Sequence, residues 1–292
     1  MKVGLKPNES LPDFLKFHFK VLLMEGLNGT TVDFKDIAFE ELVHHGLYSK
    51  VWRATFQGRT IAVKEYDLNN LATYRFPRTN NQGYKDGESL YTKERLFYEH
   101  VSRFRNYGRY LPLFFGTSHQ SSHRYILIEY CHLGSLGHID SDNRVILNES
   151  VSGLREAERK AVLQSMVSAV KYLHTRGHIH MDLKPDNFLV FRNSHQGKLK
   201  VKLSDFNFYC KKSQRRVKQR YGTLVYSSPE SINFSSKGYC PKSSELWSLG
   251  VSLYVAAHES LPFNLLEFFS NLASEDAESM PHALFEAEFK RH

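Results

Sequence analysis

The sequence predicts an α+β protein in which most strands precede most helices along the chain. Residues 51–56 and 60–64 are β-like runs joined by a turn at Gln57-Gly58, which indicates a β-hairpin. Between Leu163 and His174, apolar residues recur at the helical period of 3.6. With 292 residues, 41 % hydrophobic and 24 % charged, the chain can form one large two-lobed domain or two small domains.

The first 38 residues form an N-terminal extension before the strand patterns, which begin near Ile37. A plausible N-cap at Ser10 and the following Pro12 begin a segment with rough helical spacing, so we expect a short helix that packs on the domain or binds a partner. The residues with this spacing are Leu11, Phe14, Leu15, His18 and Leu22.

After the hairpin, the pattern predicts an enlarged polar loop, a helix and a buried strand. Residues 69–87 are rich in Asn, Pro and Gly, which favours a loop. The segment 91–104 is expected to be helical, and the apolar run 125–131 predicts a buried strand.

The second half begins with a helix that we expect to face the core through Leu163, Met166, Val167, Val170, Leu173 and His174. Beyond it, residues 188–191 and 199–203 are β-like and are separated by a polar turn. Such a hairpin would bring its two ends, Asn187 and Asp205, close together.

Two loops contain the residues that indicate chemistry. Residues 180–187 read His-Met-Asp-Leu-Lys-Pro-Asp-Asn, and Asp205-Phe206-Asn207 follows the second hairpin. Asp and Asn are common in turns, so each of them alone would mean little. The joint spacing of Asp182, Lys184, Asn187 and Asp205 is far more specific, because it combines a carboxylate base with oxygen ligands suited to Mg²⁺.

These motifs resemble the catalytic and metal-binding loops of eukaryotic protein kinases. The resemblance implies a mainly antiparallel β N-lobe with one main helix, over residues 39–130, and a larger, mainly helical C-lobe over 131–292. It assigns Asp182 and Lys184 to catalysis, and Asn187 and Asp205 to Mg²⁺.

The same resemblance implies an ATP site. Lys64 ends the run Ile61-Ala62-Val63-Lys64 and would bind the α and β phosphates, paired with Glu94 or, as the alternative, Glu99. The other ATP-binding residues that it implies are Gly46, Val51, Ala62, Glu129, Cys131 and Leu189.

The sequence departs from the kinase pattern at several positions. His44 and Ser49 stand where the phosphate loop usually has glycines, and Met181 replaces the arginine before the catalytic aspartate. Asn207 replaces a glycine, and we expect it to tolerate positive φ. Glu245 replaces an aspartate, and only 29 residues follow Phe263, which predicts a C-lobe without its final helices.

The function implied is ATP- and Mg²⁺-dependent phosphoryl transfer to Ser or Thr hydroxyls of a protein. Lys184 and the segment 222–230, which resembles the end of a kinase activation segment, favour a protein substrate. The alternative is a pseudokinase or scaffold that acts through protein binding, which the departures above favour. A kinase of small molecules or lipids ranks third.

The composition indicates where the protein is located and what it binds. No apolar run is long enough for a membrane span, and three separated cysteines favour a reducing compartment, so we expect a cytosolic protein, with the nucleus as the alternative. The formal charge of +8 does not indicate nucleic acid, because no nucleic-acid motif accompanies it. Six of the ten residues 211–220 are Lys or Arg. Such a run is most often a solvated loop, and the alternatives are a nuclear-import signal or a docking patch for an acidic substrate or regulator. The oligomeric state is left open.

Overall fold

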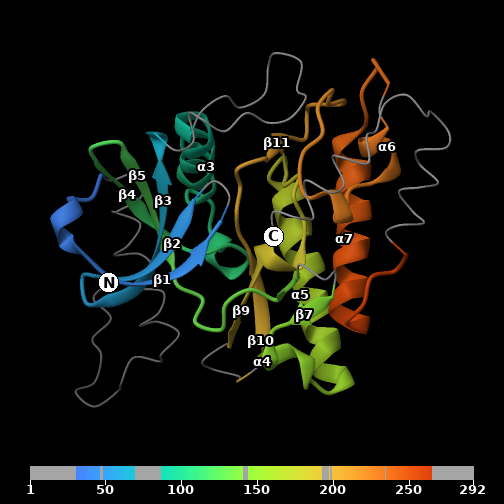
Figure 1. The fold of residues 1–292 in the computed structure, drawn as a ribbon, viewed down its shortest axis with the longest axis horizontal. Coiled ribbons are helices and arrows are strands. Elements are labelled where there is room, and N and C mark those ends of the chain that lie inside the picture. The colour runs from blue at the N-terminus through green and yellow to red at the C-terminus, as the bar shows by residue number, and fades with distance from the viewer. Residues whose placement is uncertain are drawn as a thin grey trace, which may run out of the picture.

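The computed structural model describes residues 31–46, 49–69, 87–140, 144–192, 197, 199–233 and 235–264. A lobe built on a β-sheet lies beside a mainly helical lobe, and the segment after β5 connects them (Figure 1). The predicted α+β, two-lobed fold is therefore confirmed.

The N-lobe contains one antiparallel sheet with the strand order β1-β2-β3-β5-β4. Its strands are β1 (Ile37–His45), β2 (Lys50–Phe56), β3 (Arg59–Asp67), β4 (Phe114–Gln120) and β5 (His123–Glu129). The predicted hairpin is β2 and β3, and the predicted strand at 125–131 is β5, which ends at Glu129.

Strand β3 lies at the centre of this sheet, and its residues 61–66 are all buried. This explains its apolar run Ile61-Ala62-Val63, because a strand covered on both faces has no solvent side to make polar, and it means that Lys64 and Glu65 are buried as well. The short 3₁₀ helix η2 (Phe34–Asp36) precedes β1, and Val32 packs into the sheet core with Ile37.

One helix, α3 (Gly87–Val101), packs beside the sheet (Figure 1). It begins before the predicted segment and ends at Val101, so Phe104 lies outside it. Its buried face carries Glu94 and Phe97, while Glu99 pairs with Arg95 on the same helix.

The C-lobe is organised around two long helices, α5 (Glu156–Thr175) and α7 (Pro241–His258). Its short elements are β6 (Gly137–Ile139), β7 (Val145–Leu147), α4 (Glu149–Ser152), β8 (His178–Ile179), β9 (Phe188–Arg192), β10 (Leu199–Leu203), β11 (Cys210–Lys211) and α6 (Pro229–Ile232), with 3₁₀ turns η4 (Pro185–Asn187) and η5 (Leu224–Tyr226). The 3₁₀ turn η3 (Tyr107–Arg109) lies between α3 and β4 of the N-lobe. Strands β9 and β10 form the predicted second hairpin.

The core-facing stripe of α5 differs from the prediction. Val167 is 42 % exposed and Leu163 is only half-buried, whereas Val162 and Ala169 are buried. An apolar residue at helical spacing does not specify the exact angle at which the helix packs, and here the buried face is rotated by about one residue from the predicted stripe.

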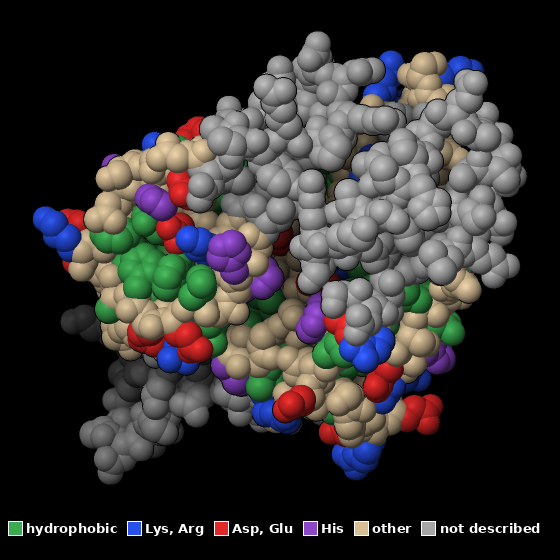
Figure 2. All heavy atoms as spheres, viewed as in Figure 1, with side chains coloured by type: hydrophobic (Ala, Val, Ile, Leu, Met, Phe, Trp, Pro, Cys, Tyr) green, Lys and Arg blue, Asp and Glu red, His purple; other side chains and the backbone are tan. Residues whose placement is uncertain are grey.

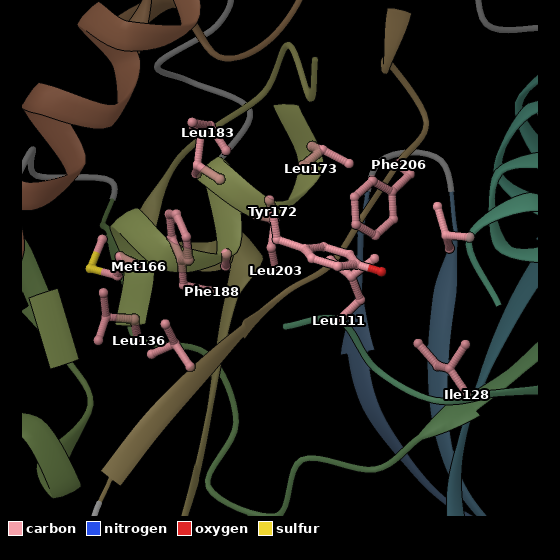
Figure 3. Close-up of a cluster of buried hydrophobic side chains, with 14 of the residues drawn as sticks. Leu111, Ile128, Leu136, Met166, Tyr172, Leu173, Leu183, Phe188, Leu203 and Phe206 are labelled. Carbon is pink, nitrogen blue, oxygen red and sulfur yellow. The ribbon is translucent and has the colours of Figure 1, made fainter. Parts of the chain in front are cut away.

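A single buried cluster extends through both lobes. It joins Ile128 of the sheet and Phe206 to residues of α5 and the β9–β10 hairpin, and it fixes the segments that carry the site (Figure 3). The predicted helix near residues 11–22, the enlarged loop, apart from its ends, and the chain after Asn264 lie outside the described residues.

Candidate active site

The loop between β8 and β9 is fastened on both sides. His180 Nε2 lies 2.8 Å from the carbonyl oxygen of Ser204, and the Asp182 N–H donates to His180 Nδ1 at 3.2 Å. From α7, Glu245 Oε2 accepts the N–H of Met181 at 2.7 Å. The loop is thus held at the residues that immediately precede Asp182.

Asp182 is buried, and its carboxylate has defined partners. Oδ1 accepts hydrogen bonds from the N–H of Thr223 at 2.9 Å and from its hydroxyl at 3.0 Å. Oδ2 lies 3.3 Å from Asn187 Nδ2, which also donates to the Asp182 carbonyl at 2.7 Å. These contacts set the orientation of the carboxylate.

Gly222 makes this approach possible. Its φ is +80°, and a Cβ placed there would lie 2.6 Å from the Met181 carbonyl oxygen and 3.1 Å from Asp182 Oδ1. Any other residue would therefore push Thr223 away from Asp182.

Lys64, Glu94 and Asp205 form a second cluster, in which Lys64 and Glu94 are buried and Asp205 is partly exposed. The Lys64 ammonium lies 2.8 Å from Glu94 Oε2 and 3.1 Å from Asp205 Oδ1. Burial alone would lower the pKa of Lys64, but the carboxylates of Asp205 and Glu94 raise it above its usual value. The structure thus selects Glu94, and not Glu99, as the partner of Lys64.

Asp205 is held as a carboxylate. Burial acts to raise its pKa, but the positive charges of Lys64 and Lys184 outweigh burial and bring the pKa below its usual value. Asp205 has φ of +65°, a left-handed conformation that Asp adopts more readily than most residues. Lys184 itself is half-buried at the start of η4.

Asn207 does not need the positive φ that we expected it to tolerate, since it is not among the residues with positive φ. Instead it is buried, and its side-chain amide lies 2.8 Å from the hydroxyl of Tyr66. Phe206 is fully buried and stacks on Phe97 of α3, with ring centroids 3.8 Å apart. The three residues 205–207 therefore point in three directions, with Asp205 at Lys64 and the other two in the core.

The donor set fits a hard divalent cation. The Asp205 side chain is 36 % exposed, and the amide nitrogen of Asn187 is engaged by Asp182, which leaves the amide oxygen as its metal-binding atom. The main chain joins their loops, because the Ser204 N–H donates to the Asn187 carbonyl at 2.9 Å. Two protein oxygens suit Mg²⁺, which keeps phosphate and water ligands.

The expected nucleotide-binding residues lie on both sides of the connection between the lobes, since Val51 and Ala62 belong to the sheet and Leu189 to β9. Ala62 belongs to the main buried cluster with Ile128, and half-buried Val51 packs against it. Leu189 is half-buried between the core residues of β9 and pairs with Ser135 after the hinge. Figure 2 shows histidine side chains beside the hollow between the lobes.

The remaining residues predicted to bind ATP are Glu129, Cys131 and Gly46. The Glu129 side chain is turned to Lys202 and to the N–H of Leu113, and the Glu129 N–H donates to the Leu113 carbonyl at 2.8 Å, so neither group is free for a ligand. Cys131 is buried, and burial raises the pKa of its thiol to about 12. Gly46 donates from its N–H to the Ser49 carbonyl at 2.9 Å, closing the turn between β1 and β2.

Two site residues were missed by the sequence analysis. Thr223 was part of the motif at 222–230 but had no assigned role, although it binds Asp182 directly. Tyr66 follows Lys64 by two residues on β3, so both side chains share one face of the strand. The two-residue spacing from Lys64 was the one signal in the sequence that could have placed Tyr66 in the site.

The comparisons with known proteins agree with this geometry. A family model described as "Protein kinase domain" matches residues 39–284. Serine/threonine-protein kinase grp of Drosophila melanogaster is 34 % identical over 161 residues, which cover 53 % of this chain and 28 % of that protein. CBL-interacting protein kinase 28 of Oryza sativa is 31 % identical over 176 residues, covering 58 % and 36 %. The chain spans about a third of the length of these relatives.

Proposed function

The chain belongs to the protein kinase family, and we propose that it transfers the γ-phosphate of ATP to serine or threonine hydroxyls of a protein substrate. The observation that carries this proposal is the convergence of Asp182, Asn187 and Asp205 with the buried Lys64–Glu94 pair. The similarity to serine/threonine-protein kinases supports it.

Each residue has a role that its contacts allow. Asp182, oriented by Thr223, would accept or orient the proton of the substrate hydroxyl. Lys184 would offer a positive charge beside the transferred group, and Asn187 and Asp205 would hold Mg²⁺. When bound, ATP would supply the phosphoryl group and Mg²⁺ would neutralise part of its negative charge.

Lys64 would orient the nucleotide phosphates, and Glu94 would keep its ammonium in place. A buried ammonium needs compensating charge, which the two carboxylates supply here. Met181 stands where an arginine would contact a phosphorylated loop, so we propose that activity does not depend on phosphorylation of the activation segment.

The substrate is proposed to be acidic. In the segment that leads from β11 to Thr223, five basic residues are exposed: Lys211, Lys212, Arg215, Arg216 and Lys218. Because this segment reaches Asp182 through Thr223, an acidic peptide bound along it would present its hydroxyl near the base.

We also propose a cytosolic location, with the nucleus as the alternative, from the three free cysteines.

The decisive test is magnesium-dependent transfer from γ-labelled ATP to a mixed Ser/Thr peptide library. The D182N variant should lose at least about 100-fold in rate while it still binds nucleotide. D36N, which changes an exposed aspartate of η2, is the matched control and should retain full activity.

If neither the wild type nor D182N transfers phosphate although both bind nucleotide, the proposal fails. The alternative, a pseudokinase that acts through protein binding, would then account for His44 and Ser49 in the phosphate loop.

A further inference from the structure

The hydroxyl of Tyr66 connects two parts of the site that are far apart in the sequence. Tyr66 has no exposed surface, and Glu94 and Asn207 are each only 1 % exposed. The hydroxyl makes a short hydrogen bond to Glu94 Oε2 and lies 2.8 Å from Oδ1 of the Asn207 side-chain amide. No catalytic role assigned above uses this contact.

The number of protons decides the direction of these two bonds. A tyrosine hydroxyl carries one hydrogen, so it can donate to only one neighbour and must accept from the other. The Glu94 carboxylate only accepts, and burial raises the pKa of Tyr66 well above its usual value, so the phenol keeps its proton. The hydroxyl therefore donates to Glu94 and must accept a hydrogen bond from the NH₂ group of Asn207. A rotation of the Asn207 amide by 180° exchanges the positions of its oxygen and its NH₂ group, and this places the NH₂ group against the hydroxyl.

We propose that Asn207 and Tyr66 are positioning residues that fix the metal-binding segment by a directed relay, from the Asn207 amide through the Tyr66 hydroxyl to the Glu94 carboxylate. The proposal rests on the proposed function, in which Asp205 binds Mg²⁺. It assigns a purpose to asparagine at 207, because only a side chain that donates there completes the relay.

The relay acts on Asp205 through its neighbours. Glu94 Oε1 accepts the N–H of Phe206 at 3.3 Å, while Oε2 receives Lys64 and Tyr66. Residues 206 and 207 are thus both tied to Glu94, one directly and one through Tyr66. Loss of the relay therefore leaves residues 206 and 207, which follow Asp205, less firmly held.

The test measures hydrogen exchange at the Phe206 amide, together with MgATP affinity, in Y66F, N207A and N207D. We expect both single losses, Y66F and N207A, to speed exchange and weaken MgATP binding about 10-fold, as for a net loss of one buried hydrogen bond. N207D should be worse than N207A, because it places a second acceptor against a hydroxyl that has one proton. The Y66F/N207A double variant should be no worse than the poorer single variant.

Y98F is the matched control. Tyr98 is also fully buried in the same cluster, and its hydroxyl makes no hydrogen bond within the described structure. Removing that hydroxyl should change neither Phe206 exchange nor MgATP affinity.

Three results would overturn the relay: Y66F exchanging like Y98F, N207D behaving no worse than N207A, or additive losses in the double variant. Phosphate transfer is scored separately. If the wild type transfers no phosphate but the exchange rates follow the expected order, the proposed function fails and the relay stands.

Discussion

Glu245 Oε2 accepts the backbone N–H of Met181 at 2.7 Å, which ties helix α7 to the residue before the candidate catalytic base. The other oxygen, Oε1, lies 2.6 Å from His174 Nε2 on α5. Glutamate here is one methylene longer than the aspartate typical of the family. The extra length lets one carboxylate join two helices and the catalytic loop.

Replacing Glu245 should therefore damage both stability and catalysis. E245A leaves a buried N–H and a histidine without their acceptor, so we expect a loss of about 2–3 kcal/mol in the free energy of unfolding. The stability of E245D should lie between that of the wild type and that of E245A, because the shorter side chain cannot reach both partners. Urea denaturation measures this, and E41A, at an exposed glutamate of β1, should change stability by less than about 0.5 kcal/mol. An E245A as stable as E41A would contradict the bracing role.

Thr223 should orient the base without contacting nucleotide. T223V removes the hydroxyl donor to Asp182 Oδ1 and keeps the backbone donor, so kcat should fall about 10-fold while KM for ATP is unchanged. T223S keeps a hydroxyl and should restore most of the activity. A rise in KM for ATP in T223V would mean that the residue acts on nucleotide binding instead.

His178 should make stability depend on pH. It is buried beside the rings of Phe97, His100 and Tyr209, and neither of its ring nitrogens has a hydrogen-bond partner among the residues that the structure describes. Burial, assisted by the positive charges of His100 and Lys211, lowers its pKa to about 4. The unfolded chain takes up this proton near pH 6.5 and the folded chain does not, so stability is complete above about pH 6.5 and falls towards pH 4.

The H178F variant should show a weaker fall in Tm between pH 6.5 and 4 than the wild type. H132F, at an exposed histidine, should follow the wild-type curve. Equal slopes for wild type and H178F would mean that His178 is not the group that titrates.

The exposed basic run should act through charge. The triple variant R215Q/R216Q/K218Q should raise KM for an acidic peptide several-fold and reduce the salt dependence of that KM, because surface charges are screened by salt. A neutral peptide should be phosphorylated equally by both forms. Neutralising Lys35, Arg105 and Lys171, which are exposed outside the run, is the control for total charge. An unchanged KM and salt dependence would remove the run from substrate binding.

The sequence predicted best what depends on neighbouring residues. The alternation and apolar content of residues 51–64 specify the hairpin, and the turn before Leu199 specifies the second one, because strand patterns and turn residues act locally. The spacing of Asp182 and Asn187 also places both in one loop, where the side-chain amide of one bonds to the other.

Helix packing was predicted less well. Helical periodicity located α5, but the rotation of the helix, which exposes Val167, is set by the β10 strand against which α5 packs.

The sequence by itself thus determined the order of the elements, the two hairpins and the set of chemical groups. Only the tertiary structure decided which groups meet: Glu94 with Lys64, Thr223 with Asp182, and Asn207 with Tyr66, 141 positions away. The reason is physical. A local pattern fixes which face of a strand or helix is apolar, whereas a hydrogen bond between distant residues depends on how all the intervening elements pack.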